Sequence, residues 1–220
     1  MTRVESGDPR EEGVSLLSFL ELGVRRSSVD DLLDAKWGSY FDFSLKPAFK
    51  FLGSDVNYLK LESVAHWFQP LWSRFEWVPL LAVRAHAGVI QPFSGSQTAD
   101  VPVFRRFYSG GANTVRGFEY QSLGPVDAQG EPQGGLTVTE LNFELRFPIW
   151  RMLSGVIFSD TGQVAREPFS LRFEDFRTSI GGGVRIKTPL GPLRFDYGRL
   201  LNPPPNTARG QFYISIGQAF

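Results

Sequence analysis

The chain contains no cysteine among its 220 residues. Disulfide bonds, thiolate metal sites and catalytic thiols are therefore excluded, while an oxidising compartment stays compatible with the composition. Net charge is missing too, because 23 Lys and Arg residues balance 23 Asp and Glu residues. A chain without a basic excess gives no electrostatic reason to bind nucleic acid, so we expect no such partner.

Long apolar runs are absent as well. No segment approaches the roughly 20 consecutive apolar residues of a transmembrane helix, which excludes a helical membrane protein. The polar, acidic lead at 1–13 has neither the positive start nor the apolar stretch of a secretory signal. Either an export signal was removed with an upstream portion of the protein, or the chain is cytosolic.

Methionine is scarce, but phenylalanine is abundant. The sequence holds 20 Phe, 23 Gly and 15 Pro against 2 Met. Aromatic residues favour strands, and Gly and Pro favour the turns between them. The length suits one domain, which we place at 14–220 after the polar lead, itself expected to be without fixed structure.

Apolar and polar residues alternate over segments of roughly 10 to 14 residues, longer than the usual soluble strand and suited to a tilted transmembrane strand. The last segment puts Phe212, Ile214, Ile216 and Phe220 on one face, and in all segments the charges occupy the alternate face. The pattern predicts nine strands, at about 14–25, 39–51, 56–69, 76–90, 135–147, 153–164, 177–189, 191–200 and 210–220.

Two folds compete for this alternation. A soluble β-sandwich buries its apolar faces, whereas an outer-membrane barrel turns them to lipid and lines a wet interior with polar residues. Strand length favours the barrel, and so does an inserted loop of over forty residues at 91–134, because long loops are usually functional. Tryptophans near predicted strand ends would form an aromatic girdle. They are Trp37, Trp67, Trp72, Trp77 and Trp150.

The long loop carries a glycine-flanked turn that projects one arginine and one aromatic ring. Its centre reads Val115, Arg116, Gly117 and Phe118. Arginine binds carboxylates bidentately where water is partly excluded. Two strands on, alternation places Phe158, Asp160 and Gly162 on one face, and Glu144 lies on the charged face of the strand between.

These pieces resemble the bacterial surface antigen or outer-membrane assembly superfamily, which includes BamA-type and TamA-type barrels and two-partner secretion transporters. The match covers about 13–220, and Tyr120 to Pro125 with the closing Gly217 to Phe220 look most like the TamA type. The resemblance implies that the loop folds into the barrel lumen, where Arg116 meets Asp160 and Glu144. The alternative interpretation is that Arg116, Asp160 and Glu144 are three unrelated charges in the lumen, each solvated by channel water.

The resemblance also implies a gate. In the family, the first and last barrel strands pair imperfectly, and a client strand adds at the open edge. Here the segment 210–220, with Phe212, Ile214, Ile216, Gly217 and Phe220, would be both the terminal assembly signal and one side of that gate. An exposed strand edge is physically able to template another strand.

The chain departs from the family pattern in size. Family barrels have sixteen strands behind periplasmic domains, whereas about nine strands are expected here, which resembles the C-terminal half of a barrel. An odd count is unusual for a bacterial single-chain barrel. Either the first predicted strand lies outside the wall and eight strands close, or the segment is completed by a partner.

Three functions remain open. The first is assembly or insertion of client outer-membrane proteins in the bacterial outer membrane, with a periplasmic or inner-membrane partner bound through upstream domains. The second is a passive or secretory pore plugged by 91–134, and the third is a soluble sandwich that binds a ligand. Crosslinking of 210–220 to a client strand would favour insertion, and conductance that rises when 91–134 is deleted would favour the pore. Purification without detergent would favour the soluble sandwich.

The sequence contains no convincing pattern of catalytic, cofactor-binding or metal-ligating residues, and we expect no enzyme, cofactor or metal. His66 and His86 lack clustered metal-ligating partners in the sequence. Glu140 and Glu144 share a face but lie about 13 Å apart along a strand, too far for a glycosidase pair. The Gly181 to Gly183 run lies inside a strand with no helix after it, which favours close packing over a phosphate loop.

Overall fold

The computed structural model describes residues 3–4, 13–14, 16–31, 34–71, 78–189, 191–204 and 207–220. Within these ranges the chain forms strands joined by loops and short 3-10 helices. None of the helices in the described residues is long and apolar enough to cross a membrane. The strands are β1 (Arg3–Val4), β2 (Gly13–Val14), β3 (Leu22–Ser27), β4 (Gly38–Ala48), β5 (Tyr58–Pro70), β6 (Leu80–Pro92), β7 (Thr137–Trp150), β8 (Leu153–Ala165), β9 (Arg177–Ile186), β10 (Leu193–Leu200) and β11 (Gly210–Ile216). The 3-10 helices are η1 (Lys50–Leu52), η2 (Thr98–Asp100), η3 (Val103–Arg105) and η4 (Phe173–Asp175).

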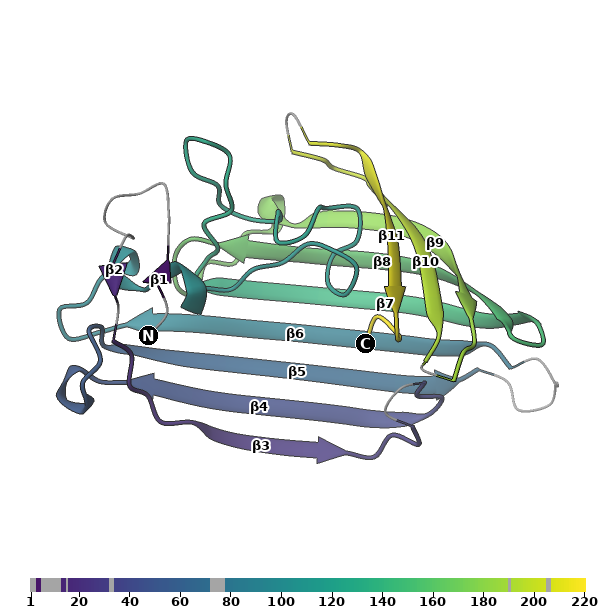
Figure 1. Cartoon of the computed structure of the whole chain (residues 1–220), viewed down its shortest axis with the longest axis horizontal. Helices are drawn as coiled ribbons and strands as arrows, with labels where there is room; N and C mark the ends of the chain where they lie inside the picture. Colours follow the sequence, from purple (N-terminus) through teal and green to yellow (C-terminus); the bar gives the residue numbers. More distant parts are fainter. Residues whose placement is uncertain are drawn as a thin grey trace.

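Nine strands form one antiparallel sheet in which each strand lies beside its neighbour in the chain, from β3 at one edge to β11 at the other. The two short strands β1 and β2 pair with each other. Figure 1 shows the sheet curling, so that β10 and β11 pass in front of the central strands. Since β3 and β11 are the two ends of the strand order, the described sheet does not close.

This architecture confirms the predicted all-β, antiparallel barrel segment. It also decides between the alternatives. The nine strands belong to a single sheet, so the two-sheet sandwich is wrong for the described residues. The closed barrel of eight strands is wrong as well, because β3 lies in the wall as a ninth strand and the order stays open.

The alternation sorts side chains as a barrel wall requires. Outward-facing apolar residues stay exposed, such as Phe212, Ile214 and Ile157, while charged residues on the other face, such as Glu144 and Asp160, are fully buried. In a soluble domain the two classes would be exchanged. The convex face therefore suits lipid, and the concave face encloses a polar interior.

Antiparallel connections divide the wall into two rims. The loop rim carries the connections 49–57, 93–136 and 166–176 and the described residues 201–204 and 207–209. The turn rim carries 28–31, 34–37, 71, 78–79, 151–152, 187–189, 191–192 and the C-terminal residues. Trp37, Trp67 and Trp150 all lie at the turn rim and are about half exposed or more. Trp72 and Trp77 of the expected girdle lie outside the described residues.

Two predicted strands differ from the structure at the ends of the chain. The first was expected at 14–25, but β3 spans Leu22–Ser27, and Phe19 makes only an isolated bridge to Ala48. Pro47 of β4 explains the shift: its carbonyl accepts a hydrogen bond from Leu20, but proline has no N–H with which to continue the ladder. The expected lead at 1–13 is described only at β1 and Gly13.

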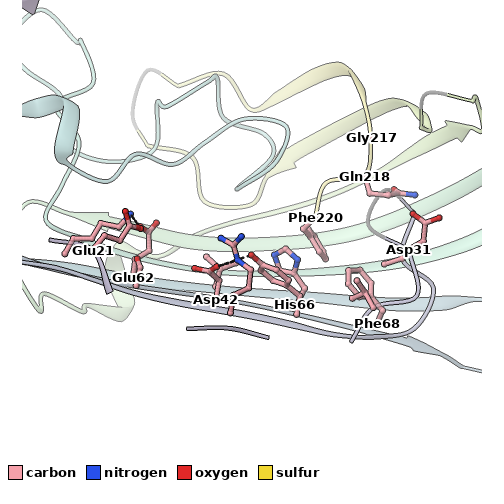
Figure 2. A pocket seen from close by; sticks show the side chains of 16 residues that line it. Glu21, Asp31, Asp42, Glu62, His66, Phe68, Gly217, Gln218 and Phe220 are labelled. Carbon is pink, nitrogen blue, oxygen red and sulfur yellow. Dashed lines mark hydrogen bonds and ion pairs between the residues drawn. The ribbon is translucent and has the colours of Figure 1, made fainter. Parts of the chain in front are cut away.

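The last strand was expected at 210–220 but ends at Ile216. Gly217 takes a φ of 95°, a conformation in which glycine is favoured, and the chain turns inward. The Phe220 ring then lies 5.7 Å from the His66 ring and joins Phe68 in a cluster inside the curl. Phe220 therefore does not share the lipid-facing side of Phe212, and Figure 2 shows it between His66 and Phe68.

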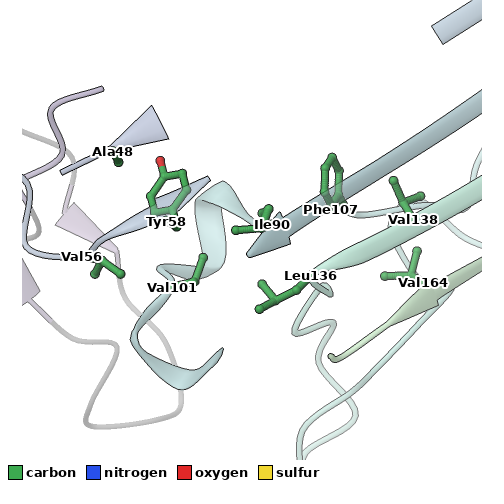
Figure 3. Packing of buried hydrophobic residues seen from close by; sticks show 9 residues of the cluster. All are labelled: Ala48, Val56, Tyr58, Ile90, Val101, Phe107, Leu136, Val138 and Val164. Carbon is green, nitrogen blue, oxygen red and sulfur yellow. The ribbon is translucent and has the colours of Figure 1, made fainter. Parts of the chain in front are cut away.

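A second group of apolar residues packs inside the curl at the loop rim. Phe107 of the long loop packs there with Tyr58, Ile90 and Val138 from three strands (Figure 3). Gly88 leaves the room for it, since a Cβ there would overlap the Phe107 ring. This cluster holds the base of the 93–136 connection against the inner wall and so positions the functional residues beyond it.

Candidate functional site

The connection between β6 and β7 folds back into the curl of the sheet, as Figure 1 shows for the teal loop. Its residues 109–111 and 115–118 are buried although they belong to no strand. Val115 and Phe118 pack with Leu123 and with Leu200 of β10. The predicted motif therefore lies in the lumen, with its aromatic residue serving as an apolar contact to the inner wall.

Arg116 meets both predicted carboxylates. Its Nε and Nη2 donate to the two oxygens of Asp160 at 2.7 and 2.9 Å, and its Nη1 donates to Glu144 Oε1 at 2.5 Å. The Arg116 backbone N–H donates to Asp160 as well, at 3.1 Å. We call these three residues the loop lock. The planar guanidinium can donate to Asp160 through two nitrogens and to Glu144 through the third, which the single ammonium group of a lysine would not reproduce.

The strands supply the rest of the pocket around the arginine. Phe158, two residues before Asp160 on β8, places its ring 3.4 Å from the Arg116 guanidinium carbon. Asn142 of β7 donates to Asp160 at 2.9 Å and to the Thr114 carbonyl at 2.6 Å. Gly162 leaves space for the loop, because a Cβ there would come within 2.8 Å of Val115.

The burial of the three charged residues determines how the loop lock affects the stability of the fold. Arg116 is 1% exposed and both carboxylates are 0% exposed. Burial alone disfavours the charged guanidinium, but Asp160 and then Glu144 outweigh that effect and raise the pKa of Arg116. A buried ion pair stabilises little by itself, but removing one partner leaves an uncompensated charge at high cost. The arrangement therefore specifies where the loop sits.

A third carboxylate, which the sequence did not single out, completes the network. Asp196 of β10 lies 3.5 Å from Arg116 Nη1 and is also paired with Arg185 and Arg194. Arg146 pairs with the second oxygen of Glu144 at 2.8 Å. The alternation had put Asp196 on the charged face, but that pattern holds many charges and does not say which of them converge.

The loop tip also contacts the last strand. The Gly117 N–H donates to Tyr213 Oη at 2.7 Å, and that hydroxyl donates to the Phe118 carbonyl at 2.5 Å. Arg194 adds a second connection: it donates to Ser215 of β11 at 2.7 Å and to the Ala112 carbonyl at 3.0 Å. The lumen face of β11 is thus joined to the motif through two hydroxyls.

Glycines on β9 and β10 make the close approach feasible. A Cβ at Gly198 would lie 2.7 Å from the Gly117 nitrogen and 2.9 Å from the Arg116 carbonyl carbon. Cβ atoms at Gly181 and Gly183 would overlap Phe158 and Asp196. The glycine run therefore thins the wall beside the loop lock, as close packing requires.

The two histidines occupy different places on the inner wall. His86 bridges Glu62 and Glu140 at 3.1 and 3.0 Å, and Glu140 also accepts a hydrogen bond from Ser109 at the entry of the loop tip. His66 lies beside Phe220 instead. His86 therefore helps to hold the loop, which the sequence pattern did not indicate.

Residues 3–220 match the model of the Omp85 superfamily domain. The chain belongs to the Omp85 superfamily. Among curated Omp85 relatives, the outer membrane protein assembly factor BamA of Neisseria meningitidis serogroup B is 28% identical over 201 residues, covering 76% of this chain and 24% of the relative.

Two other similarities extend the comparison. The chloroplastic outer envelope protein 80 of Arabidopsis thaliana is 34% identical over 119 residues, covering 50% of this chain and 14% of the relative. The crystal structure of BamA from Haemophilus ducreyi lacking POTRA domains 1-3 superposes with a TM-score of 0.77 at 22% identity, covering 90% of this chain and 42% of that one. This likeness supports the fold.

The chain spans about a quarter or less of the length of these curated relatives. Their names are BamA and outer envelope protein, so the TamA type predicted from the residues after the motif stays a prediction. The Omp85 family itself is established by the match over nearly the whole chain.

Proposed function

We propose that this Omp85 chain forms part of a bacterial outer-membrane barrel that assembles or inserts other outer-membrane proteins. The relatives named BamA are outer membrane protein assembly factors, and the chain aligns with them over most of its wall. Its partners on this proposal are the lipid bilayer around the apolar face and client barrel proteins. A periplasmic or inner-membrane partner reached through upstream domains stays a prediction.

The observation that carries the proposal is the edge of β11. This strand pairs with β10 along Gly210–Ile216, and no described residue pairs with its other edge. An unpaired edge presents a row of backbone donors and acceptors that can add a further strand. The segment 210–216 would thus be the template for a client strand.

The loop lock would position that edge. The bonds of Arg116 fix the loop tip to β7 and β8, and the Tyr213 hydroxyl ties the same tip to β11. A strand with only one neighbour has few other contacts that hold its orientation. The lock would therefore keep the lumen face of β11 in place while its free edge accepts a client.

Crosslinking tests the template directly, and the cysteine-free chain is suited to it. The chain carrying Ile214→Cys is reconstituted in liposomes and mixed with an unfolded client barrel that has one cysteine in its last strand. Disulfide adducts should exceed those of the matched variant Ile180→Cys, which is also exposed on the outer face but lies inside the sheet on β9. Equal adducts at both sites would reject templating by β11.

One observation favours a second function, a pore with a plug. The loop tip lies inside the curl and packs against the inner wall, as a plug would. Planar-bilayer conductance distinguishes the two functions, because deletion of the tip 109–123 should raise it steeply only if the wall encloses a pore. The experiment is informative whatever the crosslinking result.

A further inference from the structure

The connection between β8 and β9 folds down over the outer face of the wall. Gln163 shows this most clearly: alternation on β8 points it outward, opposite to the lumen-facing Gly162, yet it is only 3% exposed. Its amide accepts a hydrogen bond from the Arg172 N–H at 3.3 Å, and it lies 3.5 Å from the Ser170 carbonyl. The loop at 166–176 is therefore what covers it.

The same loop is fastened to two other elements. Thr137, outward-facing on β7, donates to the Glu167 carbonyl at 2.9 Å, and Thr98 of the long loop donates to the Glu167 side chain at 2.9 Å. Held in this way, the loop leaves large apolar side chains in the open. Phe169 is 68% exposed and Leu171 is 54% exposed.

Beneath the loop, the outer face of the sheet is hollowed by short side chains. The register aligns Ser63 of β5 with Ala87 of β6, and Ala87 with Thr139 of β7. On its other edge, Ser63 pairs with Phe43 of β4, whose large ring borders this row of small side chains. Leu61 and Val89, the next outward-facing pair on β5 and β6, border the small side chains as well, and the row forms a trough beside them.

A groove of about 370 Å³ occupies this trough. Its volume lies within the range of about 300–1,000 Å³ that is usual for ligand sites. Outward-facing Phe43, Leu61 and Val89 line it from the wall, and Phe169 and Leu171 line it from the loop. Glu62 adjoins the groove, but its carboxylate points to the lumen, where it bonds His86.

We propose that this groove binds one acyl chain of a membrane lipid, held between the wall and the 166–176 loop. The groove is continuous with the apolar outer face that includes Phe43, and its outward-facing side chains carry no charge. An apolar chain removes Phe169 and Leu171 from water, and their exposure is otherwise unfavourable. The site lies at the loop rim and is independent of the strand-templating function.

A photoreactive lipid tests the site. The chain is reconstituted in liposomes of phosphatidylcholine with a small fraction carrying a diazirine on one acyl chain, and adducts are mapped by mass spectrometry after illumination. We expect adducts concentrated on 166–176 and on the strand residues around Ser63 and Ala87. Ala87→Phe fills the trough and should remove most of them.

The matched control is Ala85→Phe, two residues along the same strand, equally outward-facing and exposed but outside the groove. It should leave the adduct pattern unchanged. Heat-modifiable gel mobility shows that each variant is folded, and Thr139→Phe fills the same trough from β7 if Ala87→Phe does not fold. Adducts spread evenly over the outer face, or unaffected by both filling variants, would mean ordinary surrounding lipid and would overturn the proposal.

Discussion

The hydroxyl of Tyr213 on the last strand accepts a hydrogen bond from the backbone of Gly117, the residue after the motif arginine, at 2.7 Å. The two residues are 96 positions apart in the chain. Their contact joins the arginine loop to the strand whose outer edge no described residue covers. The position of the loop and the attachment of β11 are consequently coupled.

Tyr213→Phe should loosen β11. The change removes both hydrogen bonds of the hydroxyl and leaves a partly buried N–H and carbonyl without that partner, at a cost of roughly 1–3 kcal/mol for each unsatisfied group. Hydrogen exchange of the amides at 210–216 should become faster. Tyr197→Phe, on the outer face of β10, is the control and should leave the exchange unchanged.

Arg116→Ala should release the loop. Buried Asp160 then loses its cationic partner, which typically costs about 3–5 kcal/mol, while Glu144 keeps its pair with Arg146. Limited proteolysis should cut within 109–123 more rapidly, and the assembly of client barrels should fall. Arg199→Ala alters an exposed arginine on β10 and should do neither. If cleavage of the loop is unchanged in Arg116→Ala, the three charges do not act as a lock.

Gly198→Ala should displace the loop without altering any charge. The added methyl would meet the backbone of Arg116 and Gly117 at under 3 Å, and overpacking of this kind costs about 1–3 kcal/mol. Proteolysis of the loop should therefore resemble that of Arg116→Ala, though more weakly. Gly23→Ala on β3 makes only an ordinary contact at 3.5 Å and serves as the matched control.

Phe220→Ala separates two roles of the terminal aromatic residue. In the structure its ring packs near His66, and its carbonyl accepts a hydrogen bond from Arg146 at 3.2 Å. Loss of the half-buried ring should lower the free energy of unfolding, measured by urea denaturation, by less than the roughly 3–5 kcal/mol typical of a fully buried phenylalanine. Phe212→Ala, on the lipid face, tests the same loss outside the curl.

A residue that acted only as an assembly signal would behave differently. Phe220→Ala would then impair insertion in cells while leaving the stability of the refolded protein unchanged in vitro. That result would contradict a structural role for the inward turn at Gly217.

Local pattern was enough to locate most of the wall. Alternation with a period of two residues depends only on neighbouring positions, and it placed the inner strands within a few residues of their observed bounds. It failed at the two ends of the sheet, where Pro47 interrupts the pairing of β3 and where Gly217 turns the chain inward. Edge strands have one neighbour, so their ends depend on contacts that a local pattern does not contain.

The sequence by itself determined an all-β chain, the positions of most strands and the separation of apolar from charged faces, because alternation depends only on neighbouring positions. The choice of a barrel over a sandwich drew also on strand length and the long loop, and the three residues of the loop lock were expected from the resemblance to a family that the arginine and aspartate motifs carry. Only the tertiary structure decided that Asp196 and Tyr213 join the lock, that Phe220 lies inside the curl, and that 166–176 covers the outer wall. These features depend on distances between residues that are far apart in the chain. Such distances are set by the curvature and register of the whole sheet.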